Sequence, residues 1–442
     1  MIGRFALLRK ILSFGPSEKG WSEIMSLFEK WPRRDDEYLI ALNYAQSHLE
    51  DWPDELRLFS QFKPKHPAWS LARSINLTDN TLGRIPKLVE HPHLTSLFLK
   101  GCRRLKTLDS LECVAHLKTL DLRGCHNLWG FDGLASMAKL KRLYLPEYTL
   151  RDYRVLSQLN ELEFLQLPVL DGPNGYSMLE GLTNLKELKL ERFVDSKNSD
   201  VLLNLPSLES MELGEIFEFP SFGEFLGEIP SLRNLSMDGF RVKEINQLNH
   251  LHGLETLELE GWYTLTDLEP VSHLVELSEL QLYRCGQLKS LKGLENCRSL
   301  SSLFLNCCER LENVNALKEL RSLQELSLSG CQSIPKIHAL AKLTDLTYLN
   351  LSRCSKIKNL DALASLNNLT QLKLANCTSL EQIDGLTGVF ELTELDFEGC
   401  ESLSNLDGLR NLSSLEHLRL SGCSKLKCIS GLRNLHELKT LD

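Results

Sequence analysis

Thirteen cysteines are the residues of this 442-residue chain best suited to metal binding or redox chemistry. Nine of them fall in two series in which neighbours are 23 residues apart: Cys102, Cys125, Cys285, Cys308, Cys331, Cys354, Cys377, Cys400 and Cys423. Equal spacing predicts one thiol per structural unit in a row, whereas a zinc site needs four ligands around one point. No C-x-x-C pair occurs. We therefore expect this cysteine column to be a packing feature, since a buried thiol is a small apolar group with a weak hydrogen-bond donor.

The remaining chemistry-bearing residues show no enzyme signature. The twelve histidines are scattered, and no nucleotide-binding, zinc-protease or nucleophile-elbow motif occurs. We therefore expect no catalytic residues, no metal site and no cofactor. The net charge of -9 disfavours nucleic acid as a partner. No apolar run is long enough to cross a membrane.

The thiols also bear on the compartment of the protein. Nine buried free cysteines would be at risk of oxidation outside the cell, so the column favours a cytoplasmic location. The alternative is a secreted effector without a cleavable signal peptide. Cys307, which precedes a column cysteine, is predicted to face outward and is a candidate reactive thiol.

A repeat must position the cysteine column. The pattern L-x-x-L-x-L recurs along most of the chain, and from Leu254 to Leu438 its interval is always 23 residues. A degenerate first copy begins at Ala72. The alternation within each copy predicts a short strand with leucines four and six buried and residues three, five and seven on the opposite face. Leucines then follow at three-residue spacing with a frequent glycine, which predicts tight 3₁₀ turns on the other side of each coil.

The full repeat, with cysteine at position nine followed by leucine three residues later, resembles the leucine-rich repeat family over residues 72–442. Its length is similar to the internalin-like and SDS22-like classes, and its cysteine is similar to plant resistance-protein repeats. The resemblance implies an α/β fold: a right-handed solenoid of about 16 repeats, with a curved parallel β-sheet on its concave side and 3₁₀ or short helical turns on its convex side. A single repeat cannot bury its leucines alone, so each depends on its neighbours.

Residues 1–71 do not fit the repeat and carry helical periodicity over 2–14, 18–31 and 35–50. A last short helix is expected over 54–62, before a loop at 63–67. The segment holds ten acidic and ten basic residues, so the net charge belongs to the array. It is predicted to be either a helical N-terminal cap or a small docking domain. At the other end the sequence stops within a strand, which predicts that the open edge is covered by another molecule, self-association included, or that the chain is truncated.

The strand positions that face away from the core are free to vary, so they carry the functional signal. They are basic in the first copies, with Lys100, Arg123 and Arg142, and become acidic in the middle of the array. Acidic side chains would attract a partner with a basic surface, and exposed aromatics anchor protein interfaces. The predicted partner-binding residues are Tyr144, Phe164, Glu187, Glu191, Glu212, Asp238, Glu258, Glu260, Glu279, Tyr283, Phe304 and Tyr348.

Residues 146–245 depart from the repeat pattern, with aromatic residues in place of the cysteine and four phenylalanines within 217–225. This stretch is either an irregularity that faces a ligand or a repacked core. The leucine-rich repeat resemblance implies a non-catalytic scaffold or recognition module that binds a protein partner on its concave face. The alternatives are a substrate-recognition subunit similar to a ubiquitin-ligase receptor, or a bacterial effector that acts on host proteins.

Overall fold

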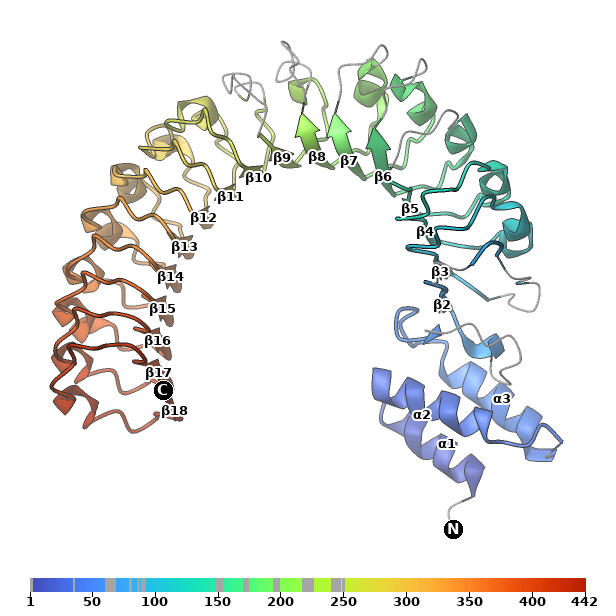
Figure 1. Ribbon diagram of the computed structural model, residues 1–442, viewed down its shortest axis with the longest axis horizontal. Helices are drawn as coiled ribbons and strands as arrows, with labels where there is room; N and C mark the ends of the chain where they lie inside the picture. Colours follow the sequence, from blue (N-terminus) through green and yellow to red (C-terminus); the bar gives the residue numbers. More distant parts are fainter. Residues whose placement is uncertain are drawn as a thin grey trace. The chain divides into compact units, whose positions relative to one another are not determined.

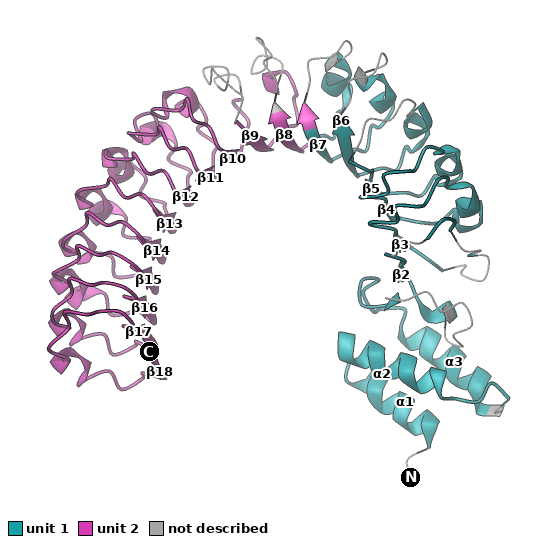
Figure 2. Cartoon of the chain, viewed as in Figure 1, with its two compact units in different colours: residues 1–191, 196–208 teal, residues 192–195, 209–442 magenta. Residues whose placement is uncertain are grey.

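The computed structural model forms two compact units, residues 1–191 with 196–208, and residues 192–195 with 209–442 (Figure 2). The structure describes residues 3–34, 36–59, 69–78, 82–85, 88, 93–147, 154–169, 175–193, 199–216, 226–239, 248 and 251–442. The expected loop at 63–67 and the phenylalanines of 217–225 lie outside these residues, as do 146–245 in part. Within the described part, no helix has the length and apolar character needed to cross a membrane.

The first unit begins with three α-helices: α1 (Arg4–Ser13), α2 (Glu18–Glu29) and α3 (Asp36–His48). They confirm the predicted helical segments. Ser17 caps α2, because its hydroxyl accepts a hydrogen bond from the Gly20 amide. Parallel strands follow (Figure 1): β1 (Leu58–Phe59), β2 (Ser74–Asn76), β3 (Ser96–Phe98), β4 (Thr119–Asp121), β5 (Arg142–Tyr144), β6 (Phe164–Val169) and β7 (Glu187–Phe193).

The short helix expected over 54–62 is wrong, because Leu58 and Phe59 form β1 and pair with β2. The preceding Arg57 explains the extended conformation, since its guanidinium is buried and donates to the carbonyl oxygens of Leu49 and Leu71. Trp21 of α2 donates from its ring N–H to the Leu58 carbonyl at 2.8 Å. These bonds join the helices to the first strand of the unit.

The second unit continues the parallel strands in regular order. They are β8 (Ser210–Ile216), β9 (Asn234–Asp238), β10 (Thr256–Glu260), β11 (Glu279–Tyr283), β12 (Ser302–Asn306), β13 (Glu325–Ser327), β14 (Tyr348–Asn350), β15 (Gln371–Lys373), β16 (Glu394–Asp396), β17 (His417–Arg419) and β18 (Thr440–Leu441). Each pairs with the next in parallel register, with one shift between β8 and β9; Leu280 of β11, for example, lies beside Leu303 of β12. The predicted parallel-sheet solenoid is confirmed.

Short 3₁₀ helices form the other side of the coils, as the three-residue leucine spacing predicts. In the first unit they are η1 (Trp69–Leu71), η2 (Asp109–Val114), η3 (Asp132–Ser136), η4 (Arg154–Gln158), η5 (Gly175–Leu179) and η6 (Ser199–Asn204). In the second they are η8 (Glu269–Val271), η9 (Leu294–Asn296), η10 (Asn315–Glu319), η11 (His338–Lys342), η12 (Asp361–Leu363), η13 (Asp384–Gly388), η14 (Asp407–Leu409) and η15 (Ser430–Leu432). Within each unit the strands line the concave side, and the repeat leucines between the two sides are buried.

The cysteine column occupies the turn between each strand and its 3₁₀ helix. Each column thiol is hydrogen-bonded to a strand carbonyl of the preceding coil; Cys354 donates to Leu328 at 3.2 Å and Cys377 to Leu351 at 3.0 Å. Burial raises the pKa of Cys377 to about 12, so its thiol stays protonated at neutral pH. The thiols therefore satisfy backbone carbonyls, as the packing interpretation predicted. Among the described residues, no group of three His, Cys, Asp or Glu side chains is placed to hold a metal ion.

Candidate functional site

The concave face of each unit carries three rows of side chains, which come from the third, fifth and seventh residues of each repeat. Alternation along a strand turns these residues away from the buried leucines. The parallel register then places the same repeat position of successive strands side by side, about 4.8 Å apart. In the second unit, for example, Glu260 of β10 lies beside Asp238 of β9 on one side and Tyr283 of β11 on the other.

Carboxylates gather on the first four strands of the second unit. We call this set the acidic tract: Glu212, Glu215, Asp238, Glu258, Glu260 and Glu279. Glu215, Asp238 and Glu260 are register partners on three successive strands. Like charges at directly opposed sheet positions destabilise the folded state. The register therefore places three carboxylates side by side in one row.

The sequence did not predict Glu215 as a residue of the concave face, because strict alternation of side chains along β8 places Gly214 there instead. A β-bulge between Leu213 and Glu215 shifts the register, so that Glu215 becomes the partner of Asp238. A bulge re-aims a side chain in this way by adding one residue to a strand. The Glu-Leu-Gly-Glu sequence at 212–215 contains a glycine inside a strand, which is the signal that such a bulge leaves.

Few cations balance the acidic tract from within the concave rows. The row positions of β8 to β14 contain no lysine or arginine. Among the described residues, two arginines approach from outside the rows: Arg192 lies 3.1 Å from Glu215, and Arg284 lies 3.7 Å from Glu260. Both pairs are solvent-exposed and therefore contribute little to stability. Glu212 and Asp238 also have interaction partners. The tract keeps a negative field on its solvent side.

Three predicted aromatics flank the acidic tract on the same unit. Tyr283 is 37% exposed and lies in register with Glu260. Phe304 on β12 and Tyr348 on β14 are half-buried on the same face. The Lys373 ammonium lies 5.6 Å from the Tyr348 ring centre. Partly exposed rings beside carboxylates give this face both apolar area and charge.

The first unit holds the other four predicted residues, in a different setting. Phe164 is not an exposed aromatic, because it is only 2% exposed. The guanidinium of Arg142 covers its ring at 4.4 Å, and the ring of Tyr144 packs beside it with centres 4.6 Å apart. Arg123 lies over Tyr144 at 4.7 Å and is also paired with Asp121. These contacts form a cluster of arginine and aromatic side chains. The arginines and aromatics were identified from the sequence, but their contacts with one another were not predicted.

The two glutamates of the first unit already have partners. Glu187 lies 3.6 Å from the Lys189 ammonium. Glu191 accepts a hydrogen bond from the Gln166 side-chain amide at 3.1 Å. Burial raises the pKa of Glu191, because the charged carboxylate loses solvation there. These two residues are therefore set apart chemically from the acidic tract of the second unit.

Exposed cysteines lie outside the column. Cys307 is half-exposed, as predicted, and adopts a positive φ of 59° at the eighth position of its repeat. Cys428 is fully exposed, and a hydrogen bond with the Ser430 hydroxyl lowers the pKa of its thiol. Cys428 lies five residues after a column cysteine, and nothing in the sequence pattern predicted its contact with Ser430.

Comparison with known proteins agrees with this geometry. Residues 261–381 and 298–427 match the BspA type Leucine rich repeat region, in six copies. No curated protein matches the sequence. The chain is similar to a solved leucine-rich repeat protein of Leptospira interrogans, with a TM-score of 0.55, 19% identity, and coverage of 82% of this chain and 99% of that one.

Two further solved structures are similar. TLR13 in complex with ssRNA13 has a TM-score of 0.56 and 19% identity, over 82% of this chain and 59% of that one. An internalin (inlF) from Listeria monocytogenes has a TM-score of 0.48 and 19% identity, over 77% of this chain and 87% of that one. The repeats of residues 261–427 therefore match the BspA type of leucine-rich repeat, and the described part of the chain has the fold of a leucine-rich repeat protein.

Proposed function

We propose that this protein is a non-catalytic recognition module whose second unit binds a basic segment of a protein partner on its concave face. Leucine-rich repeat folds are typical of protein–protein interaction modules. The observation that carries the proposal is the acidic tract itself, in which six carboxylates lie on four adjacent strands of one face. Lysine and arginine side chains of a partner would be attracted to these carboxylates and steered toward them.

The surroundings of the acidic tract supply the remaining parts of an interface. Tyr283, Phe304 and Tyr348 offer apolar area next to the charged rows. The strands are held by the sheet on both sides, so binding orders little of the backbone and loses little entropy. Tyr144, Phe164, Glu187 and Glu191 of the first unit remain predicted contacts, with Phe164 reachable only if Arg142 moves.

The same surface would serve a substrate-recognition subunit of an enzyme complex or an effector that acts on host proteins, so these stay alternatives within the proposal. One structural neighbour is described with ssRNA. The net charge of -9 and the acidic tract favour a basic protein for this chain instead. We further propose a cytoplasmic location, because the free thiols of the cysteine column are suited to a reducing compartment.

Affinity capture with purified variants tests the proposal. The test variant carries Glu212→Gln, Glu258→Gln and Glu279→Gln on the face. The matched control carries Glu276→Gln, Glu391→Gln and Glu437→Gln, which are exposed and share the last position of their repeats, away from the strands. A partner retained by wild type and control, lost by the test variant and weakened by salt is expected. Equal retention by all three proteins contradicts the assignment of this face.

A further inference from the structure

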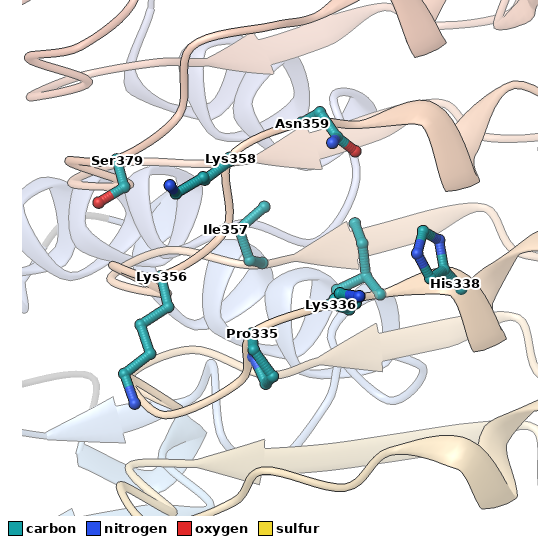
Figure 3. Close-up of a pocket in the computed structure, with 9 residues that line it drawn as sticks. Pro335, Lys336, His338, Lys356, Ile357, Lys358, Asn359 and Ser379 are labelled. Atoms are coloured by element: carbon teal, nitrogen blue, oxygen red, sulfur yellow. The ribbon is translucent and has the colours of Figure 1, made fainter.

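A hollow lies on the flank of the second unit, between the cysteine column and the 3₁₀ helices η11 and η12. Its volume is about 470 Å³, which falls in the range of small-molecule sites. Figure 3 shows its lining: lysines 336, 356 and 358 and His338 surround a floor that includes Pro335 and Ile357. Lys358 lies beside Ser379, the Lys356 side chain extends away from Ser379 on the Pro335 side, and Lys336 and His338 lie at the other end. The hollow is separate from the concave face.

Pro335 accounts for the opening between these coils. At the same repeat position, Glu312 donates its backbone N–H to the Lys289 carbonyl, and Glu381 donates to Lys358. Proline has no N–H, so the coil that contains Pro335 cannot make this bond to the coil before it. The two coils on either side are therefore held together less closely along this flank.

The hollow also leaves backbone donors unused. In this fully described stretch, the N–H groups of Lys336, Lys358 and Asn359 have no protein acceptor within hydrogen-bonding distance. Backbone N–H groups without a partner are satisfied by water or by a ligand. Adjacent N–H groups at 358 and 359 are the kind of donors that bind anions in protein sites.

The lysines around the hollow are available to a ligand. Among the residues that the structure describes, no carboxylate lies within 4.0 Å of the ammonium groups of Lys336, Lys356 or Lys358. At the Pro335 position, the preceding coil has Glu312 and the following coil has Lys358, and Glu312 does not reach these lysines. With no carboxylate within reach, the positive charge of the three lysines is uncompensated.

We propose that this hollow binds a small phosphate monoester, with the phosphate held by the lysine ammonium groups at its rim. Ammonium groups form short, charge-assisted hydrogen bonds to phosphate oxygens. The side chains of Ile337 and Ile357 are buried beneath the rim, and with Pro335 they give the organic part of the ligand an apolar floor. The site is independent of the proposed protein-binding face.

Calorimetric titration with inorganic phosphate and with glucose 6-phosphate tests the proposal, with glucose and chloride as reference ligands. The test variant is Lys356→Gln/Lys358→Gln. Its matched control is Lys425→Gln/Lys427→Gln, which removes two exposed lysines at the same repeat positions three repeats further along. A second variant, Pro335→Glu, keeps every lysine and places a carboxylate at the hollow. Circular dichroism confirms that each protein is folded.

We expect both phosphates to bind wild type and control, with glucose 6-phosphate the tighter because of the apolar floor. The loss of two charge-assisted bonds should weaken binding about tenfold or more in the test variant. Pro335→Glu should weaken it similarly. Absence of phosphate binding to wild type, or an equal loss in the two lysine-pair variants, overturns the proposal, since the second result indicates general charge attraction. Equal affinity for the two phosphates overturns the role of the apolar floor.

Discussion

Replacement of Glu258 by glutamine should stabilise the free protein. Glu258 is exposed on β10, and the register places Asp238 of β9 and Glu279 of β11 diagonally across from it. Diagonal neighbours in a sheet are about 7 Å apart, and two unit charges at that distance in water repel by about 0.6 kcal/mol. Only the Glu279 pair is counted, because Arg284 lies 3.7 Å from Glu260 and Asp238 has an interaction partner of its own.

Salt sets the size of the effect. Screening at 0.15 M reduces this pair to about 0.25 kcal/mol, which is the stabilisation expected of Glu258→Gln. At 0.01 M salt the gain should rise to about 0.5 kcal/mol. Urea unfolding followed by circular dichroism at both salt concentrations measures this difference. The matched control is Glu276→Gln, an exposed glutamate outside the strand rows, which should change stability at neither salt concentration.

The refuting result is a Glu258→Gln protein whose stability does not exceed that of Glu276→Gln at 0.01 M salt. The carboxylates of the acidic tract would then not repel one another in the folded state. In that case the register of charges would no longer support a basic partner. A stabilisation that is the same at both salt concentrations would contradict the electrostatic explanation of the gain.

Three other outcomes follow from the structure. Gly385→Ala should lower the free energy of unfolding by about 3 kcal/mol in urea, because a Cβ would lie 2.0 Å from a backbone oxygen of the preceding coil. The control Gly286→Ala, which has open space around it, should change the free energy of unfolding by no more than about 0.5 kcal/mol. Arg142→Ala should cost about 1 kcal/mol in the same assay, because it uncovers an aromatic ring; an unchanged midpoint would contradict the cluster. Cys428 should react with a maleimide faster than the exposed Cys113 at pH 7, since its lowered pKa gives more thiolate. Peptide mapping of the labelled protein measures the two rates, and equal rates at pH 7 would contradict this prediction.

The regular parts of this protein follow from local pattern. The six-residue strand motif and the cysteine column repeat at the interval that each coil needs, and each coil contacts only its neighbours. Buried leucines, exposed row positions and thiol-to-carbonyl bonds were therefore predictable from spacing alone, as were the three N-terminal helices. Local pattern was not sufficient over 54–62, where a helix was predicted. The buried guanidinium of Arg57 and the pairing with β2 give this segment an extended conformation instead.

Thus the sequence by itself determined the solenoid, the side of each strand that faces solvent and the acidic character of the middle copies. Only the tertiary structure decided which of these side chains meet. A bulge brings Glu215 into the row of Asp238, Arg142 covers Phe164, and Pro335 opens a hollow among lysines. These features depend on contacts between coils that break the repeat, and such contacts leave no periodic signal in the sequence.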